Sequence, residues 1–529
     1  MSQRVALPDL DTLTPEALKA LIVAQHEQIL SKDEQLLCKE GQLSSLAEEI
    51  ERLKLLIAKL RRMQFGRKSE KLEREIAQLE LKLDELETSR AQQSIAASTP
   101  LVVSAVNRTA KRARQPLPAH LPRETHKMLP KQEACPDCGG RLKPLGEDVS
   151  EMLEYVPEHF KVVRQVRPKL ACASCDKIVQ AEAESRPIER GIAGPGLLAH
   201  VLVSKYADHL PLYRQAEIYA RDGVELAEWV GGCSRLLQPL VEALRRHVMS
   251  ADKLHADDTP VPVLAPGRGK TKTGRLWTYV RDDRPWGDKT PPAVWFAYTP
   301  DRKGEHPKAH LKEFIGTLQA DAYAGYGPVY EGGGVKESAC MAHVRRQFYD
   351  LYEAHKSPAA KEALERIGAL YAIEEEIRGH SAEERRAVRT ERGKPLLESM
   401  KQWMEEILGK LSKKSDTTRA IHYALDRWEA LTRYCDDGRL EIDNNAAERG
   451  LRAVVLGRKN YLFAGSDAGG ERAAAIYGLI GTAKLNGLNP EAYLREVLSR
   501  IPDHPINRIE ELLPWNLAAE LTESSHRAA

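Results

Sequence analysis

The sequence predicts a multidomain α/β protein, and three observations lead to this fold class. A chain of 529 residues is too long for one ordinary domain. Two Cys-x-x-Cys pairs, Cys135/Cys138 and Cys172/Cys175, predict a small module of their own. Short β-rich runs over residues 252–345 are divided by Gly, Pro and Asp turns and followed by helical patterns, which is typical of an α/β core.

Composition and charge exclude several classes of protein. The sequence has no run of about eighteen apolar residues and no basic-then-apolar signal at its start, so we expect an intracellular protein with no membrane partner. Eight cysteines are too few for a secreted disulfide scaffold. A net charge of +2 gives no overall preference for nucleic acid, so any DNA affinity depends on local basic patches.

Residues 1–90 have the apolar repeat of a leucine-zipper-like segment. Leu and Ile recur in steps of three and four, stop near Phe65-Gly66 and then resume, which predicts two helices with a joint. The repeat positions are Leu43, Leu46, Ile50, Leu53, Ile57, Leu60, Leu72, Ile76, Leu79, Leu83 and Leu86. The narrow apolar seam favours homo-oligomerisation through a coiled coil. The alternative is two amphipathic helices that pack on the rest of the chain.

A change of composition marks the next segment. Residues 91–130 are rich in Ala, Ser, Thr, Gln, Pro and scattered basic residues, which predicts a disordered basic linker. The Lys and Arg residues of this linker have two interpretations: they contact phosphates, or they form a solvated basic tether.

The two Cys-x-x-Cys pairs predict a four-cysteine zinc-binding domain over residues 131–190. Two knuckles that each supply two thiolates make a tetrahedral structural Zn²⁺ site. The run "EHFKVVRQVRPKL" between them is strand-like, so a hairpin would bring Cys135 and Cys138 close to Cys172 and Cys175. A redox motif and a chance pattern are the competing interpretations. Four bases on this module fit a DNA-facing surface: Lys161, Arg164, Arg167 and Lys169.

The remaining chain alternates between helical and strand-like patterns. Residues 191–250 are helical, either a helix-turn-helix-like DNA-binding region or a plain packing unit. Residues 251–345 and 436–485 form the α/β core, residues 346–435 a helical insertion, and residues 486–529 a C-terminal region. Pro260 and Pro262 predict that the first core strand is short, bulged or on an edge beyond Asp257.

Three acids at element ends are candidates for one site. Asp257 lies in the first core strand with His255 on the same face, whereas Asp258 points the other way. Asp321 follows the apolar run "FIGTLQA" and precedes a glycine turn. Each aspartate alone is explained better as a turn or cap residue.

The third acid, Glu448, lies three residues after Asn445, the spacing of a capping box. However, Glu448 shares an arc of its predicted helix with Arg449 and Arg452, and Arg458 and Lys459 follow. An acid among bases suits a metal and a phosphate at one place. Three carboxylates from separate elements hold two Mg²⁺ ions about 3.5–4 Å apart in phosphodiester cleavage.

The motifs occur in an order that resembles the insertion sequence sixty-six family of bacterial transposases. The matching blocks include "QFGRKSEKL", "CPDCGG…CASC", "SKYADHLPLYRQ", "HADDTPVPVL", "LQADAYAGY", "CMAHVRRQF", "EIDNNAAERGLR" and "GRKNYLFAGSDAGGERAA". The resemblance covers nearly the whole chain. This sequence has Asp257-Asp258 where the family usually has Asp-Glu, a change that leaves the first proposed metal ligand intact.

The resemblance implies a DDE transposase with an RNase H-like catalytic core that cuts transposon ends and transfers them into target DNA. It assigns catalysis and Mg²⁺ (or Mn²⁺) binding to Asp257, Asp321 and Glu448, and structural Zn²⁺ to the four cysteines. It implies a bacterial cytoplasmic protein, nucleoid-associated when bound to DNA. The partners implied are terminal inverted repeats, target DNA and small accessory proteins of the same element. The DNA-binding candidates are Arg345, Arg346, Arg449, Arg452, Arg458 and Lys459.

His255 and His343 are further candidates, either as residues that orient DNA or metal ligands or as structural contacts. Two other classes of function use the same sequence features. A non-catalytic zinc-ribbon DNA-binding regulator would have a dead core, and a nuclease would use the same acids without strand transfer.

Overall fold

The computed structural model describes residues 117–529 except 157–158, 227, 266–269, 413–414 and 528–529. The leucine-zipper-like segment and most of the expected linker lie outside the described residues. The elements below belong, apart from the first residue of β6, to one compact unit that spans residues 115–263 and 273–529. No helix in the described ranges is long and apolar enough to cross a membrane.

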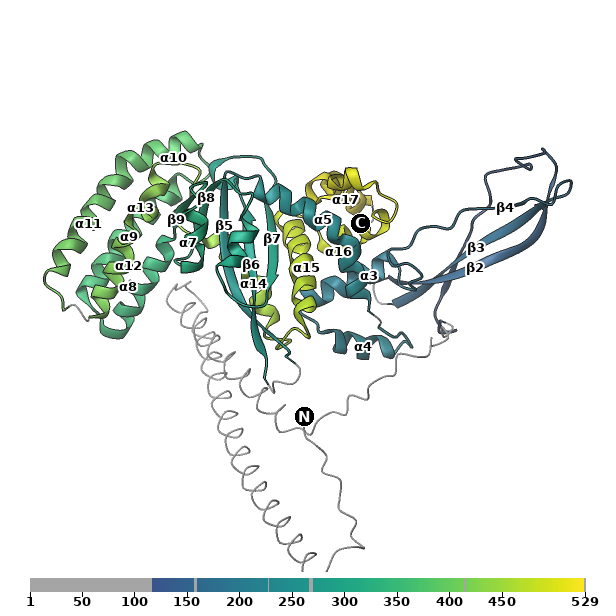
Figure 1. Ribbon diagram of the computed structural model, residues 1–529, viewed down its shortest axis with the longest axis horizontal. Helices are drawn as coiled ribbons and strands as arrows, with labels where there is room; N and C mark the ends of the chain where they lie inside the picture. Colours follow the sequence, from purple (N-terminus) through teal and green to yellow (C-terminus); the bar gives the residue numbers. More distant parts are fainter. Residues whose placement is uncertain (1–116, 157–158, 227, 266–269, 413–414, 528–529) are drawn as a thin grey trace, which may run out of the picture. The chain divides into compact units, whose positions relative to one another are not determined.

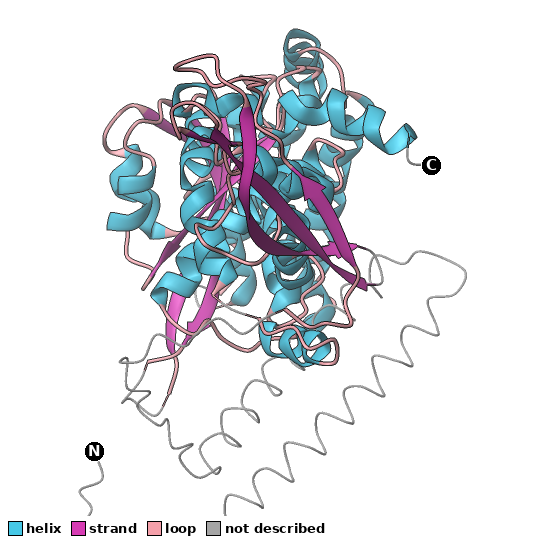
Figure 2. Ribbon diagram, turned by 90° about the vertical axis from the view of Figure 1, so that its right-hand side faces the viewer, coloured by secondary structure: helices cyan, strands magenta, loops and turns pink. Residues whose placement is uncertain are grey.

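A long antiparallel hairpin dominates the cysteine-containing module. Its strands β2 (Leu142–Val156) and β3 (His159–Cys172) pair from Leu142↔Cys172 to Val156↔His159. The sheet order is β1-β3-β2, with β4 (Ile178–Gln180) also paired to β3. The hairpin expected between the two cysteine pairs is therefore present, and Figure 2 shows its long strands.

The end of the expected linker is structured. Residues Arg123–Lys127 form β1, which pairs in parallel with β3 from Arg123↔Val162 to Lys127↔Val166. The linker prediction was therefore wrong for this part of residues 91–130. An isolated polar strand such as "RETHK" has little β signal of its own, and the exposed edge of β3 supplies the backbone partners that order it.

Three helices follow the cysteine module. They are α3 (Pro195–Tyr206), α4 (Leu212–Ala220) and α5 (Trp229–Met249). Helix α3 is buried along most of its length and packs against β2, α15 and α16. Helix α5 packs against β7. These contacts show a packing role for residues 191–250, and a DNA-binding role for them stays a prediction.

A five-stranded sheet forms the centre of the core, in the order β7-β6-β5-β8-β9. The outer strands β6 and β7 are antiparallel, whereas β5, β8 and β9 run in parallel. Helices lie around these strands in Figure 2. The strands are β5 (Lys253–Val263), β6 (Lys272–Arg281), β7 (Ala293–Thr299), β8 (Gly316–Ala320) and β9 (Val335–Ala339).

The prolines of β5 fit the sheet because of the strand's neighbours. The parallel pairing of β5 with β8 runs from Lys253 to His255, and β8 ends at Ala320. Beyond that point the Pro260 carbonyl accepts from Arg458, and the Pro262 carbonyl accepts from the backbone N–H of Ala464. The strand is longer than expected, but Pro260 and Pro262 do lie where it has lost its β8 neighbour.

A helical insertion follows β9 and has its own core. It contains α8 (Met341–His355), α9 (Pro358–Glu376), α10 (Ala382–Val388), a π-helical turn (Arg389–Gly393), α11 (Lys394–Leu408), α12 (Asp416–Leu425) and α13 (Trp428–Thr432). Figure 1 shows this group beside β9. Met400 and Met404, four residues apart on α11, are fully buried in this second hydrophobic cluster.

Short polar residues start several of these helices. Ser357 accepts a hydrogen bond from the backbone N–H of Ala360, and Ser381 with Glu384 forms a complete capping box. Such caps satisfy N–H groups that have no partner within the helix. They set where the helices of the insertion begin.

The chain then returns to the sheet. Helix α14 (Asn445–Gly457) packs against β5 and α15 (Asp467–Leu485) packs against β7. Helix α16 (Pro490–Arg500), a 3₁₀ segment (Ile506–Leu512) and α17 (Pro514–Arg527) complete the described chain. The insertion therefore separates β9 from α14 along the sequence, while both contribute to one core.

Candidate active site and zinc centre

The four cysteines of the hairpin module converge on one point. Cys135 Sγ lies 3.4 Å from Cys175 Sγ, and Cys138 Sγ lies 3.5 Å from Cys172 Sγ and 3.3 Å from Cys175 Sγ. All four ligand atoms lie within 4.8 Å of one another, and the cysteines are free thiols. Four sulfurs at this spacing fit one tetrahedral Zn²⁺ ion and its structural role.

Backbone amides in the knuckles favour the thiolate form that binds a metal. The N–H of Ser174 donates to Cys172 Sγ at 3.4 Å, and this bond is the main reason that the pKa of Cys172 is lowered to about 6. A thiolate is the form of cysteine that ligates zinc. The local turn therefore prepares the ligand before any ion arrives.

The basic residues of the hairpin are mostly paired within it. Lys161 lies 2.7 Å from Glu124, and Asp148 lies 2.6 Å from Lys169 and 3.8 Å from Arg167. Exposed pairs of this kind contribute little to stability. They also reduce the positive charge that this face offers to DNA.

The second candidate site lies where β8 ends, beside the middle of β5. The parallel register pairs His255 with Gln319, so two residues further Asp257 is level with Asp321. Adjacent strands are about 4.8 Å apart, and paired residues of parallel strands face the same side. The two aspartates are brought together by sheet register, although they are 64 positions apart in the sequence.

Glu448 approaches from the first turn of α14. Asn444, and not Asn445, is the cap residue, and no side chain caps this helix. The capping box expected from Asn445 and Glu448 was therefore wrong. The Glu448 carboxylate makes no hydrogen bond or ion pair to any other described residue, and it is only partly exposed. Its electrostatic neighbours include Asp257 and Asp443.

The electrostatics of the acids agree with a site that needs a cation. Burial, together with the carboxylates of Asp321, Asp258 and Glu448, raises the pKa of Asp257 to about 7. Burial also raises the pKa of Asp321. Buried carboxylates near one another resist ionisation unless a positive charge joins them. Oxygen donors of this kind are the ligands that Mg²⁺ prefers.

The spacing of the acids is wider than that of the cysteines. Among the described residues, Asp257, Asp321 and Glu448 do not form a group with all ligand atoms within 4.8 Å. One small ion would need such a tight cluster, whereas two ions about 3.5–4 Å apart need a broader one.

A buried side-chain clip sets the start of α14 against the sheet. Asn444 Nδ2 donates to the carbonyl of Ala256 at 2.8 Å, and its Oδ1 lies 3.1 Å from His255 Nδ1. Burial lowers the pKa of His255 to about 3, so the ring is neutral and its Nδ1–H is the donor. The backbone N–H of Asn444 donates to Cys340 Sγ at 3.2 Å. One residue thus connects β5, the end of β9 and the helix that carries Glu448.

Gln319 provides a second clip two residues before Asp321. Its side chain donates to the carbonyl of Glu441 at 2.7 Å and accepts from the N–H of Glu441 at 3.0 Å. Strand β8, which precedes Asp321, therefore holds the loop that leads to α14 and Glu448. His255 and Gln319 are 1% exposed, so both are structural contacts.

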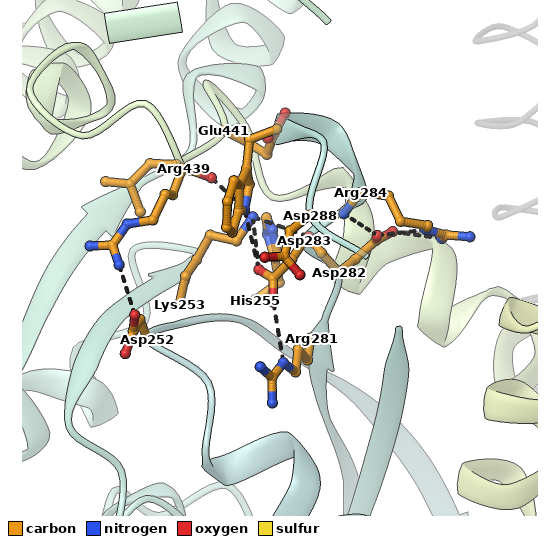
Figure 3. Close-up of polar contacts among 12 residues, drawn as sticks. Asp252, Lys253, His255, Arg281, Asp282, Asp283, Arg284, Asp288, Arg439 and Glu441 are labelled. Atoms are coloured by element: carbon orange, nitrogen blue, oxygen red, sulfur yellow. Dashed lines mark hydrogen bonds and ion pairs between the residues drawn. The ribbon is translucent and has the colours of Figure 1, made fainter. Parts of the chain in front are cut away.

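Figure 3 shows a charged cluster that anchors the same returning segment. The buried Lys253 donates to the carbonyls of Asp282 and Arg439, at 3.1 and 3.0 Å. Arg439 also donates to Asp252 at 2.8 Å, and Arg284 pairs with Asp282. The cluster joins the start of β5, the end of β6 and the loop before α14.

The six predicted DNA-binding residues are placed on α8 and around α14. Arg346, Arg449, Arg452 and Lys459 are exposed, whereas Arg345 and Arg458 are partly buried. Arg449 lines a cavity of about 390 Å³ with Asp282 and Glu441. None of the three proposed catalytic acids lines this cavity. His343 is close enough to Asp321 to influence its charge.

Sequence reasoning missed two groups near the acids. Asp443 accepts from Tyr371 at 3.2 Å and has a pKa raised by burial, and Arg302 lies 3.6 Å from Asp321. Asp443 belongs to the motif "EIDNNAAERGLR", so the motif could have identified it as a residue near the acids. Arg302 comes from a loop with no distinctive spacing, and only the fold places it beside the acids.

The fold and the two sites define a zinc-finger protein whose α/β core carries a carboxylate site suited to divalent cations. Four described families match successive parts of the chain. "Transposase IS66 family" matches residues 190–472, and "IS66 C-terminal element" matches residues 478–515. "Zinc-finger binding domain of transposase IS66" matches residues 132–176, and "Transposase C of IS166 homeodomain" matches residues 52–125.

Relatives from Sinorhizobium fredii (strain NBRC 101917 / NGR234) match most of the chain. The uncharacterized protein y4hP is 42% identical over 480 residues, which is 86% of each chain. The uncharacterized protein y4qI is 40% identical over 478 residues, covering 86% of this chain and 87% of the relative. The chain belongs to the IS66 transposase family, as its sequence motifs predicted. The same matches support DNA as its partner and zinc as a structural ion.

Proposed function

We propose that this protein is a DDE transposase whose core is RNase H-like. The supporting observation is the sheet: the order β7-β6-β5-β8-β9 has a central strand, β5, that carries Asp257 next to the strand that ends at Asp321. In this proposal an acid within β5, an acid just after β8 and a third acid on the helix packed against β5 form one composite site. Membership of the IS66 transposase family gives the class of reaction.

In this proposal Asp257, Asp321 and Glu448 would hold two Mg²⁺ ions. When bound, the ions activate the attacking oxygen and stabilise the departing one. The chain's own contribution is to fix the carboxylates. The Asp258 N–H donates to Asp257 at 2.7 Å, and the Tyr323 N–H donates to Asp321 at 3.2 Å. The Glu448 carboxylate makes no hydrogen bond or ion pair to the described residues, so in this proposal it is available to bind the metal ions.

The reaction has two balanced steps. In cleavage, water attacks the phosphodiester at the transposon end, a new P–O bond forms and the bond to the 3′-oxygen breaks, which leaves a 3′-hydroxyl. In strand transfer, that 3′-hydroxyl attacks a target phosphodiester, joins to it and releases a target 3′-hydroxyl. The same acids serve both steps, because both displace one oxygen at phosphorus by another.

The other modules have supporting roles in the proposal. Structural Zn²⁺ on the four cysteines holds the hairpin, and the helical residues 191–250 bind DNA next to it. The basic residues of α8 and α14 contact the DNA backbone without reading sequence. The N-terminal segment forms a coiled coil between protomers. The element's small accessory proteins are further partners, and the complex works on the bacterial nucleoid.

The test is a transfer assay with purified protein, labelled element ends, target DNA and Mg²⁺. Asp257→Asn, Asp321→Asn and Glu448→Gln should each lower strand transfer by at least about 10²–10³-fold, the scale for losing one preorganised electrostatic group. Binding of the labelled ends should survive in all three. Glu471→Gln is the matched control, since Glu471 is an exposed acid near the start of α15, outside the site.

The outcomes separate the candidate functions. Full activity in any one acid variant removes that residue from the site. Hydrolysed ends without joined products would identify a nuclease. DNA binding without cleavage in Mg²⁺ or Mn²⁺ would identify a non-catalytic regulator.

A further inference from the structure

A guanidinium lies directly against the proposed acidic site. Arg302, in the loop between β7 and α6 (Glu305–His310), has its Nη2 3.6 Å from Asp321 Oδ2. The Arg302 side chain is 37% exposed, whereas that of Asp321 is 23% exposed. A basic group this close to a proposed metal ligand has either a structural role or a role toward the substrate.

Three contacts besides Asp321 fix the position of Arg302. Its Nε and Nη2 donate to Asp258 Oδ1 at 3.0 and 2.8 Å. The guanidinium carbon lies 4.0 Å from the ring centre of Tyr323, and the Tyr323 hydroxyl donates to the carbonyl of Arg302. Planar stacking and a two-atom contact with one carboxylate hold a guanidinium in one orientation.

The anchor, Asp258, is shared by two arginines. Its side chain is 1% exposed, and Arg275 Nη1 lies 2.9 Å from its second oxygen. Arg302 Nη1 makes no hydrogen bond to the described residues. Arginine has five N–H donors, so Arg302 keeps donors for a further acceptor.

We propose that Arg302 contacts a phosphate oxygen of the DNA strand beside Asp321, and that Asp258 and Tyr323 are its positioning residues. This inference rests on the proposed function. Once divalent cations are ligated by Asp321, its carboxylate is no longer the best partner for the guanidinium. A phosphate at the same place accepts two parallel N–H bonds from one guanidinium. The donors of Arg302, held in one orientation beside Asp321, match that acceptor.

The same geometry gives Asp258 a role as the residue that positions Arg302. In this proposal Asp258 does not ligate the metals, because its two oxygens pair with Arg275 and Arg302. A longer acid at this position would move the anchor of Arg302 by one methylene group. Residue 258 thus sets how far Arg302 reaches toward the DNA.

The chain offers a matched control for the test. Arg275 and Arg302 are both paired with Asp258, but the ion pair to Asp321 is made by Arg302. We compare Arg302→Gln, Arg302→Lys and Arg275→Gln. Binding to labelled element ends is measured in Ca²⁺ over a series of salt concentrations, and strand transfer is measured in Mg²⁺. Thermal unfolding of each protein reports any loss of folding.

If Arg302 contacts a phosphate, Arg302→Gln reduces the salt dependence of binding by about one unit of slope. It also lowers transfer by about 10²–10³-fold. Arg302→Lys recovers the slope but only part of the rate, because a lysine lacks the two-pronged contact. Arg275→Gln keeps the wild-type slope.

The proposal is overturned if Arg302→Gln and Arg275→Gln change the slope and the melting temperature equally, because both would then act only through Asp258. It is also overturned if Arg302→Gln leaves the slope unchanged. If the wild type transfers no strand at all, the proposed function fails. A slope difference between the two variants would still support the phosphate contact.

Discussion

The zinc centre and the carboxylate site are built in opposite ways. The four cysteines come from two short knuckles at the base of one hairpin, and their sulfurs lie as close as 3.3 Å. The three acids come from β5, the end of β8 and the first turn of α14, across a helical insertion, and they are spaced more widely. One site is local, whereas the other is assembled by the whole core.

The partners of the two ligand sets differ as well. Backbone N–H groups in its own knuckle favour the thiolate of Cys172. Asp257 is opposed by burial and by the other carboxylates, and its pKa rises to about 7. In the zinc centre the local turn favours the thiolate of Cys172, although the neighbouring thiols raise the pKa of Cys175, whereas in the acidic site burial and the neighbouring carboxylates both oppose ionisation of Asp257. We expect the first metal to support folding and the second to bind only when the reaction requires it.

Removal of zinc is the strongest test of this contrast. Cys172→Ser or a strong chelator should unfold the hairpin module, since structural Zn²⁺ contributes about 10–16 kcal/mol in zinc-finger peptides. Amide hydrogen exchange should then lose protection in β2 and β3 and keep it in the sheet of the core. Cys233→Ser, a buried cysteine of α5 outside the centre, is the control for zinc content. Unchanged exchange in the hairpin would show that zinc is dispensable there.

The pH dependence of stability tests the acidic site. A pKa raised from 3.8 to about 7 corresponds to about 4 kcal/mol at most. The native state then binds the extra proton between about pH 4 and 7, so stability falls as pH rises through that window. Asp257→Asn removes the cost and should melt several degrees above the wild type at pH 8, on a scale of about 2–4 °C per kcal/mol.

Two measurements sharpen this prediction. The difference in melting temperature should shrink as the pH is lowered to 5. Added Mg²⁺ should stabilise the wild type at pH 8 and have a smaller effect on Asp257→Asn, because a ligand that binds the native state raises its stability. A variant that is less stable than the wild type at pH 8 would contradict the uncompensated site.

A smaller effect is expected from the clip that positions Glu448. Asn444→Ala leaves the Ala256 carbonyl and the His255 N–H without partners, which should lower the free energy of unfolding by about 1–3 kcal/mol. The freed start of α14 should also slow transfer by about 10²-fold, since displacement of a reacting group by about 1 Å has that cost. Denaturant unfolding and the transfer assay measure the two effects.

The control for the clip is the neighbouring amide. Asn445→Ala loses a contact with Asp443 at 2.7 Å that is only partly buried. It should reduce both quantities less than Asn444→Ala does. Equal effects would show that the clip has no special role in placing the helix.

Periodic and local features of this protein could be read from its sequence. The Cys-x-x-Cys pairs and the strand-like run between them predicted the hairpin and the four-sulfur centre, because one turn and one register place those ligands. Met400 and Met404 are four residues apart and therefore share one face of their helix, and both are buried. The strand β1 was missed because its order depends on the edge of β3 and not on its own residues.

The sequence by itself determined most of the elements and the four cysteines of the zinc centre, since turn geometry and apolar periodicity are local properties of the chain. Only the tertiary structure decided that Asp257 lies level with Asp321, that Asn444 clips α14 to β5, and that Arg302 reaches the acids from another loop. These contacts join residues far apart in the chain. Their physical cause is the burial of the sheet and helices in one core, which no short stretch of sequence contains.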